Sequence, residues 1–334
     1  LSTALFFELR IDVLIDNKSK VELLIKMIDS QYIDKVTKEI KKYEKKTQVP
    51  LDSYQRVCKD KKTYKEAFSE IIKFNNVRSD GRKLDEHRKM FIKLGVSADC
   101  RGSCYIELGE TKVIVGVHGP KEIPNIQEYT ELGKLECIIE YAPFASLTRK
   151  RSTSEQSDKY MSAAMRRALE PVFCRHEFPN LMIQVSAFVI EDDGCVLSAA
   201  ITGASLAIAH GRLPLFDFAA AISISLHNDL IFIDPTKAEE EFCLNTVSAD
   251  EKKIENYGVI SVAYMPHLDQ ISHYQMIGNM DPKLYESTLD IMLNHCRALY
   301  SLCSQHLMQE VKLTTKHLLQ VKETQDALNS LSVT

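Results

Sequence analysis

The stretch EDDGCVLSAAITGA, residues 191–204, decides how the middle of this chain folds. It follows the alternating run LMIQVSAFVI, which predicts a strand, and it leads into an apolar, alanine-rich segment, which predicts a helix. Gly194 lies between the two and predicts a tight turn. A strand end with the acidic pair Asp192 and Asp193 before a glycine turn is a common place for catalytic or phosphate-binding residues. The side chains of residues 195–197, however, cannot bind an anion.

Strands and helices alternate on both sides of this stretch. Before it, residues 104–120 predict a hairpin with its turn at Gly109, residues 134–146 a strand and residues 157–176 an amphipathic helix. After it, residues 219–234 and 259–278 each predict a hairpin, and a long helix is expected over about 282–319. The polar segment 235–258 predicts a mobile loop or an insertion. The predicted fold class is α+β (mixed α/β), with helices packed on sheets.

Composition divides the chain into two predicted domains. Residues 1–76 are rich in lysine and poor in glycine, and Pro50 divides a helical pattern there into two helices. This extension is either a solvated helical face or an arm for nucleic acid or a partner. The second predicted domain covers residues 77–325, with halves at 77–212 and 213–325.

Charge, hydropathy and cysteine content exclude several classes of protein. The formal net charge of −4 excludes a uniformly basic nucleic-acid binder. No apolar run approaches the roughly 18 residues that a membrane-spanning helix needs, and charges within the first 16 residues argue against a secretory signal. The nine cysteines contain no C-x-x-C pair, which favours reduced thiols. His295, Cys296, Cys303 and His306 lack zinc-ligand spacing, so we expect core packing there and predict no metal or cofactor.

Several motifs in a fixed order resemble the RNase PH family. They are RSDGR at residues 78–82, GVSADCRG from residue 95, YAPFAS, RRALEP, FPNLMIQVSAFVIEDDG, ITGASLAIA and DPTKAEEE. Within that family the chain is similar to the ring subunits of the eukaryotic exosome. The resemblance implies one of six RNase PH-like subunits in a hexameric ring that threads RNA, with S1/KH cap subunits as further partners. It also implies residence in the nucleus, nucleolus and cytoplasm, with no membrane attachment.

The resemblance also implies that the catalytic site is degenerate. Active relatives cleave RNA with inorganic phosphate, which they grip with a Thr-Arg pair after the Asp-Gly turn and with paired arginines at the start of the preceding helix. Val196 and Leu197 stand at the first pair of positions here, and Gln156 and Ser157 at the second. We therefore expect a non-catalytic subunit. The alternative is an active phosphate-dependent 3′–5′ exoribonuclease with a rearranged site. An isolated RNA-binding module is less favoured, because the chain has no tryptophan and its aromatic residues are not interleaved with basic ones.

The metal-binding aspartate of active relatives has no certain counterpart. Thr246 or Val259 falls near its place, depending on where the gap is drawn, and Asp250 stays open. The run of Glu239, Glu240 and Glu241 could attract Mg²⁺, but three consecutive carboxylates usually form a solvated face.

Two basic features are candidate RNA contacts. Arg149, Lys150 and Arg151 lie in a polar loop that faces the ring channel in relatives, where cations suit backbone phosphates; the alternative is a solvated loop tip. Arg78 and Arg82 flank the Ser79-Asp80-Gly81 turn. They either contact RNA or form salt bridges that anchor the first strand of the domain.

Overall fold

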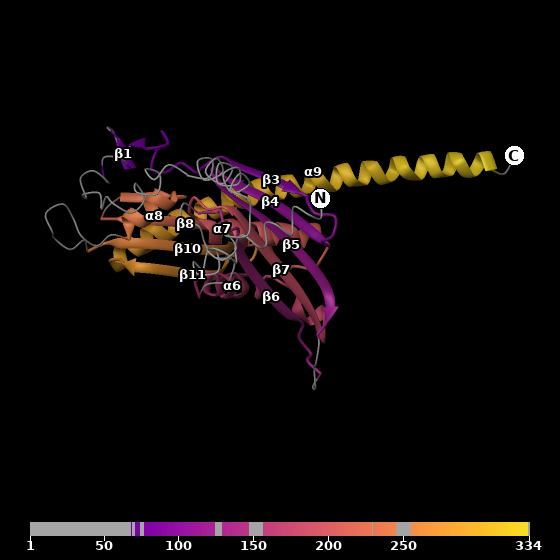
Figure 1. Cartoon of the computed structure of the whole chain (residues 1–334), viewed down its shortest axis with the longest axis horizontal. Coiled ribbons are helices and arrows are strands. Elements are labelled where there is room, and N and C mark those ends of the chain that lie inside the picture. Colours follow the sequence, from indigo (N-terminus) through magenta and orange to yellow (C-terminus); the bar gives the residue numbers. More distant parts are fainter. Residues whose placement is uncertain are drawn as a thin grey trace, which may run out of the picture. The chain divides into compact units, whose positions relative to one another are not determined.

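Figure 1 shows the chain as a computed structural model. It describes Phe68 and residues 71–73, 77–123, 129–146, 156–228, 230–244 and 255–332. By its internal contacts the chain divides into Leu1–Lys62 and Thr63–Thr334, and all described residues belong to the second unit. Among them, no helix is long and apolar enough to cross a membrane.

The first sheet has five strands in the order β3-β4-β5-β7-β6. These strands are β3 (Met90–Leu94), β4 (Gly102–Leu108), β5 (Thr111–Glu122), β7 (Leu181–Glu191) and β6 (Lys134–Tyr141). Neighbours are antiparallel except β6 and β7, which run parallel. A parallel pair needs a crossover, and the helix α6 (Gln156–Leu169) lies in the connection between them. On β7, every second residue from Ile183 to Val189 is buried, as expected for a strand with one covered face.

The second sheet has four antiparallel strands in the order β11-β10-β8-β9. They are β8 (Ala220–His227), β9 (Leu230–Ile233), β10 (Tyr257–Met265) and β11 (Gln270–Asn279). All residues of β8 are buried, because helices cover it. A two-stranded sheet pairs β1 (Ile72–Lys73) with β2 (Val77–Arg78).

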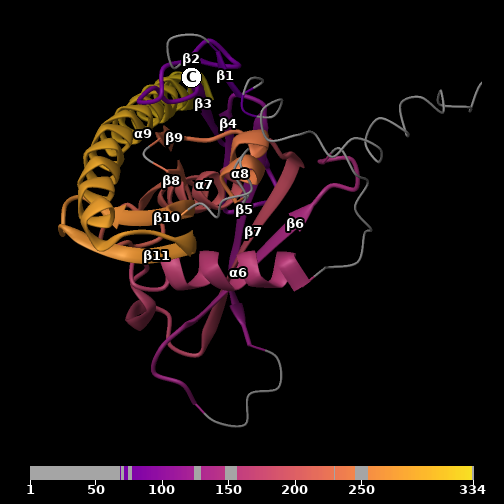
Figure 2. The same ribbon diagram turned by 90° about the vertical axis from the view of Figure 1, so that its left-hand side faces the viewer.

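Helix α7 (Val196–His210) lies between the two main sheets (Figure 2). It contacts β4 and β5 on one side and β8 on the other. Its small residues permit this close packing: a Cβ atom at Gly203 would lie 3.1 Å from Cγ2 of Val115. The remaining helices are the 3₁₀ turn η1 (Arg175–Glu177), α8 (Lys237–Cys243) and α9 (Pro282–Ser332), which packs on β8, β10 and α7.

The predicted fold class is confirmed. The hairpins β4–β5, β8–β9 and β10–β11, the strands β6 and β7 and the helix α7 form where the sequence pattern placed them. Helix α6 also forms there, but it ends at Leu169, before the end of the helix expected over residues 157–176. The described cysteines have no disulfide partner, and Cys296 and Cys303 are fully buried in the core, where core packing was expected.

Three expectations need correction. The polar segment 235–258 is not all loop, because it contains α8, which begins with a capping box between Thr236 and Glu239. The C-terminal helix runs to Ser332 rather than 319. Ile72 and Lys73, at the end of the predicted helical extension, form a strand; the rest of that extension, apart from Phe68 and Ile71, lies outside the described residues.

Candidate functional site

The site is built around the turn that joins β7 to α7. Gly194 has φ +85° and Cys195 has φ 55°, so both adopt the left-handed backbone that a sharp turn requires. A Cβ atom at Gly194 would lie 2.7 Å from the backbone nitrogen of Lys237, the first residue of α8. The turn therefore packs directly against the start of α8.

An internal carboxylate binds the backbone of this turn. The amide of Cys195 donates a hydrogen bond to Oε1 of Glu240, on α8, at 2.9 Å. Nζ of Lys237 forms an ion pair with the Asp192 carboxylate, and the backbone amide of Lys237 donates to the carbonyl of Asp193 at 3.1 Å. The amide of Cys195 is thus already bound by a carboxyl oxygen of the protein itself.

The surroundings of Glu240 are rich in negative charge. Burial raises the pKa of Glu240 to about 7; the amide of Cys195 opposes the shift and the charge of Asp192 adds to it. Burial also raises the pKa of Tyr141, and the charges of Asp192, Asp158 and Glu240 raise it further. Three carboxyl groups therefore lie close enough to raise the pKa of the Tyr141 hydroxyl. Lys237 is already paired with one of them, Asp192.

Arg88 fixes the other side of the turn. Its guanidinium donates to the Asp193 carbonyl at 2.8 Å and to Oδ1 of Asp234 at 2.7 Å. Thr111 Oγ1 donates to the Gly194 carbonyl at 2.8 Å. Burial opposes ionisation of Asp234, but the hydrogen bond and charge of Arg88 hold the pKa of that carboxyl below its ordinary value. Arg88 and Asp234 are both buried, so this pair positions the turn and is closed to solvent.

The positions predicted to have lost their phosphate ligands lie at the ends of two helices. Val196 and Leu197 begin α7 and are buried in the hydrophobic core, with exposed fractions of 5% and 4%. Gln156 begins α6. Ser157 is exposed, and its Oγ donates to the carboxylate of Asp158 at 3.1 Å.

The expected RNA contact by Arg78 is wrong, because this side chain is fully buried. It donates to the backbone carbonyl of Ile233 at 2.7 Å and lies 3.6 Å from the Glu239 carboxylate. Its alternative interpretation, a salt bridge that anchors the first strand, fits these contacts. Arg82 pairs with Asp80 at 3.1 Å and its side chain is 12% exposed, so its charge is largely committed within the domain. Arg149, Lys150 and Arg151 lie outside the described residues.

The expectation of a solvated face at residues 239–241 holds only for Glu241. Glu239 is buried as part of the capping box, and Glu240 binds the turn. Val259 lies within β10, opposite Ser225 of β8. Asp250 and Thr246 lie outside the described residues, and no group of three or more potential ligands that could hold a metal occurs in the part of the chain that the structure describes.

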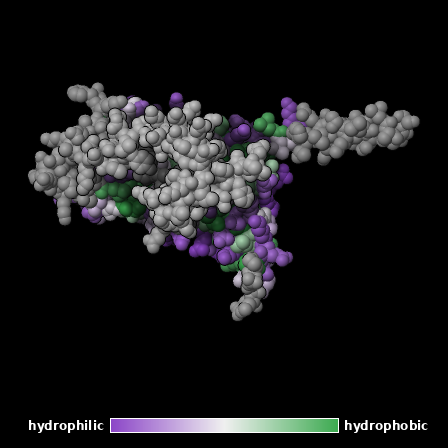
Figure 3. Space-filling view, viewed as in Figure 1, coloured by the Kyte–Doolittle hydropathy of each residue, from purple (hydrophilic) through white to green (hydrophobic). Residues whose placement is uncertain are grey.

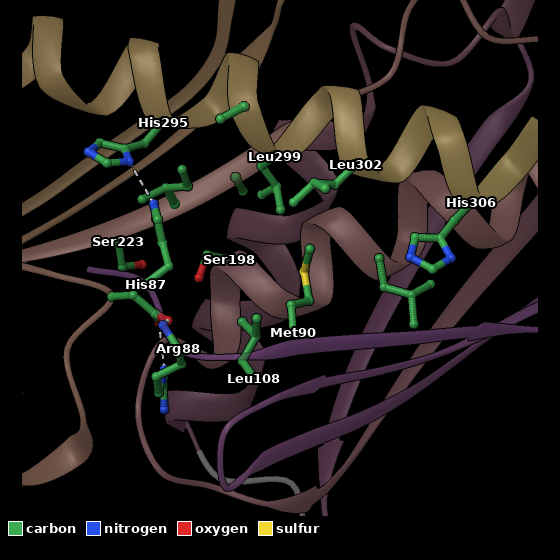
Figure 4. A pocket seen from close by; sticks show the side chains of 15 residues that line it. His87, Arg88, Met90, Leu108, Ser198, Ser223, His295, Leu299, Leu302 and His306 are labelled. Atoms are coloured by element: carbon green, nitrogen blue, oxygen red, sulfur yellow. Dashed lines mark hydrogen bonds and ion pairs between the residues drawn. The ribbon is translucent and has the colours of Figure 1, made fainter. Parts of the chain in front are cut away.

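Beside the turn, a cavity of about 230 Å³ lies beneath α9 (Figure 4). The imidazoles of His87 and His295 meet at one end, with 2.8 Å between Nε2 and Nδ1, and His306 lies at the other end. Burial lowers the pKa of His87 to about 4, so this pair is uncharged at neutral pH. Arg88 borders both the cavity and the turn. The remaining lining is mostly apolar and comes from β3, β4, α7, β8 and α9, with Asp234 after β9 as a further polar residue.

Sequence reasoning did not assign the residues that hold the turn to that role: Arg88 was not singled out, Asp234 and Lys237 appeared only within a family motif, and Glu240 only as a possible Mg²⁺ ligand. One local signal was present, because Thr236 and Glu239 have the spacing of a capping box and so predict the helix that carries Glu240. No local signal links Arg88 to Asp234, which lies 146 residues away.

Comparison with known proteins gives a family model and individual relatives that point to the same family. Residues 86–214 match the model of the 3′ exoribonuclease family, domain 1 (RNase PH). The chain is 30% identical over 239 residues to the exosome complex component Rrp41 of Nitrosopumilus maritimus, which covers 71% of this chain and 93% of the relative. It is 37% identical over 166 residues to an RRP41-like exosome component of Arabidopsis thaliana, covering 50% of this chain and 63% of that protein.

Solved structures show the same fold. Rrp46 of rice superposes with a TM-score of 0.59 at 20% identity, covering 69% of this chain and all of that one. A chain of the Archaeoglobus fulgidus exosome with RNA bound to the active site superposes with a TM-score of 0.57 at 22% identity, covering 67% of this chain and 92% of that one.

Proposed function

The chain belongs to the RNase PH family of 3′ exoribonucleases, and from that membership we propose that it is a non-catalytic subunit of an exosome core ring. In this role it supports 3′–5′ RNA processing and degradation through assembly and RNA threading. Its partners are other RNase PH-like subunits, S1/KH cap subunits and RNA, and it acts in the nucleus, the nucleolus and the cytoplasm. We further propose that its counterpart among the ring subunits is mRNA transport regulator three, exosome component 6; the segments LEPVF, VSAFVIEDDG and IDPTKAEEE support this finer assignment.

The hydrogen bond between the Cys195 amide and Glu240 carries the proposal. Phosphorolysis needs inorganic phosphate bound at this turn, and phosphate is an anion that requires free N–H donors and cations. Here the amide already binds a carboxylate, and Leu197 stands where relatives place an arginine. Losing one such electrostatic group typically reduces the rate by about 10²–10³.

The charge around the turn supports the same conclusion. Asp158, Asp192 and Glu240 all act on Tyr141, and the ammonium of Lys237 is paired with Asp192. A phosphate that approached this surface would meet repulsion from like charges in a partly buried setting, where screening by water is weak.

A second candidate is an active phosphate-dependent 3′–5′ exoribonuclease. The observation that favours it is the family itself: the matching model describes 3′ exoribonucleases, and the similar archaeal protein is an Rrp41. Such an enzyme would need to displace Glu240 from the turn before phosphate could bind.

A phosphorolysis assay separates the two candidates. The full chain is incubated with Mg²⁺, phosphate and a short uniformly labelled RNA, alone and mixed with an RNase PH-like partner subunit. We expect no nucleoside diphosphate above background from the chain alone, and co-elution with the partner in size-exclusion chromatography. Phosphate-dependent release of diphosphates that disappears in Asp192→Ala would establish the enzyme instead. A stable monomer with no affinity for any RNase PH-like subunit would exclude the ring assignment.

A further inference from the structure

The cavity beneath α9 has the size and the walls of a small-molecule site. Its volume of about 230 Å³ exceeds the roughly 150 Å³ of an apolar protein cavity that binds benzene. Leu299 of α9 faces Met90 and Leu108, of β3 and β4, across the space (Figure 4). A cavity of this volume with apolar walls has room for a flat molecule of two fused rings.

The cavity reaches the surface on the side of α9. Two apolar residues of its lining, Ala298 and Leu302, are exposed, and the exposed fraction of Leu302 is 49%. Further along the same helix, Figure 3 shows hydrophobic surface where α9 leaves the sheets. A molecule can therefore enter the cavity from solvent past the apolar side chains of Ala298 and Leu302.

The charged groups in the interior of the lining are already paired. Arg88 and Asp234 form a buried ion pair at 2.7 Å. His87 and His295 share a hydrogen bond, and burial lowers the pKa of each imidazole, so this pair is uncharged at neutral pH. His306, at the other end, is exposed. A charged ligand would lose its hydration without gaining a partner inside the cavity, so the lining favours a neutral molecule.

One buried hydroxyl in the lining can only accept a further hydrogen bond. Ser198 of α7 and Ser223 of β8 point toward each other (Figure 4). The Ser198 hydroxyl already donates to the carbonyl of Cys195 at 2.8 Å, so its two lone pairs are its remaining capacity. Ser223 shares a hydrogen bond with Ser261 at 2.8 Å. A buried acceptor such as Ser198 favours a ligand that brings an N–H donor.

We propose that this cavity is a binding site for a neutral, flat heterocycle of two fused rings that carries a ring N–H group. The rings lie between Leu299 on one side and Met90 and Leu108 on the other, and the N–H group donates to Oγ of Ser198. Indole and benzimidazole are simple members of this class. The site does not rest on the assignment of the chain to an exosome ring.

The fluorescence of added indole tests this proposal, because the chain has no tryptophan. Excitation beyond the absorption band of tyrosine therefore reports only the ligand. Titration of the full chain into indole should shift the indole emission to shorter wavelength and should saturate. Benzothiophene has the same shape without the N–H group, and it should displace indole with about tenfold lower affinity. Indole-3-acetate carries a carboxylate and should bind more weakly than indole.

Two matched pairs of variants locate the site. Ser198→Ala should lower the affinity for indole about tenfold and leave that for benzothiophene unchanged. Ser205→Ala should change neither affinity, because Ser205 is buried in the same helix but does not line the cavity. Ala298→Met should fill the entrance and lower both affinities at least about tenfold. Gln305→Met is its control, since Gln305 is exposed on α9 outside the lining, and it should change neither.

Three results would overturn the proposal. Equal affinities of the wild type for indole and benzothiophene would exclude the hydrogen bond to Ser198. Binding that does not saturate, or that Ala298→Met leaves unchanged, would place indole outside the cavity. Tighter binding of indole-3-acetate than of indole would contradict a neutral ligand. Saturating indole should also raise the Tm of the wild type but not that of Ala298→Met. The comparison of the three ligands on the wild type does not depend on the folding of any variant.

Discussion

Glu240→Gln should stabilise the protein at neutral and alkaline pH and have little effect in mild acid. Burial raises the pKa of Glu240 from 4.5 to about 7. Between these values the folded protein holds a proton that the unfolded chain releases. Folding stability attributable to this group is therefore fully present below about pH 4.5 and is lost as pH rises through about 7.

The size of the effect follows from the shift. A difference of about 2.5 pKa units corresponds to at most about 3.4 kcal/mol at 1.36 kcal/mol per unit. Partial exposure of Glu240 reduces the expected difference to about 1–3 kcal/mol. Glutamine keeps a side-chain oxygen that accepts from the Cys195 amide and removes only the charge, so the hydrogen bond at 2.9 Å is retained.

The assay is the free energy of unfolding in urea at pH 5, 6, 7 and 8, for the wild type and for Glu240→Gln. The difference between the two proteins cancels the contributions of the other groups that titrate in this range. Glu241→Gln is the matched control, because Glu241 is exposed on the same helix, and it should show no pH-dependent difference. If Glu240→Gln gave the same stability increment at pH 5 and pH 8, or destabilised the protein at pH 8, Glu240 would not be a strained, buried carboxylate.

Three further comparisons test other features of the chain. Arg78→Ala should lower the free energy of unfolding by about 3–5 kcal/mol, because it leaves Glu239 buried without its cation. Arg82→Ala should lower it by less than about 1 kcal/mol, since its partner Asp80 is exposed. Equal losses of unfolding free energy in the two variants would contradict the argument from burial. Gly194→Ala should destabilise the protein by more than the matched Gly81→Ala, since both glycines have φ near +85° but a Cβ atom only at Gly194 would lie 2.7 Å from a backbone atom. Thermal unfolding compares the two variants, and equal decreases in Tm would exclude the contact with Lys237 as the cause. Replacing Arg149, Lys150 and Arg151 with alanine should flatten the log–log salt dependence of RNA binding by the assembled ring by up to about two units, at about 0.7 per phosphate; an unchanged slope with an intact ring would remove this loop from the RNA path.

The elements of the fold could be predicted because each carries a local signal. Alternation over residues 181–191 and the glycine before residue 195 placed β7, the turn and the start of α7 without reference to the rest of the chain. Helix α8 was missed because its polar residues resemble a loop until its cap is recognised. The end of α9 was placed too early, although no glycine or proline follows residue 319.

The site could be predicted only in part, because its decisive contacts join distant segments. That Val196 and Leu197 cannot bind phosphate follows from their chemistry alone. The contact between Glu240 and the turn could not be predicted in this way. Cys195 and Glu240 lie 45 residues apart in the sequence and meet only through the packing of α7 against the second sheet. Arg78 is a case in which the sequence suggested too much. Its charge made it a candidate RNA contact, but the folded structure buries its side chain completely.

The carboxylate at the Cys195 amide also bears on how such a chain evolves. An arginine regained at position 197 would enter a turn whose amide already holds Glu240, and the new charge would be neutralised within the protein. Removal of Glu240 alone would empty the turn without supplying a cation. On the proposed non-catalytic assignment, phosphate binding at this turn therefore requires two changes together: an arginine at position 197 and removal of the Glu240 carboxylate from the Cys195 amide.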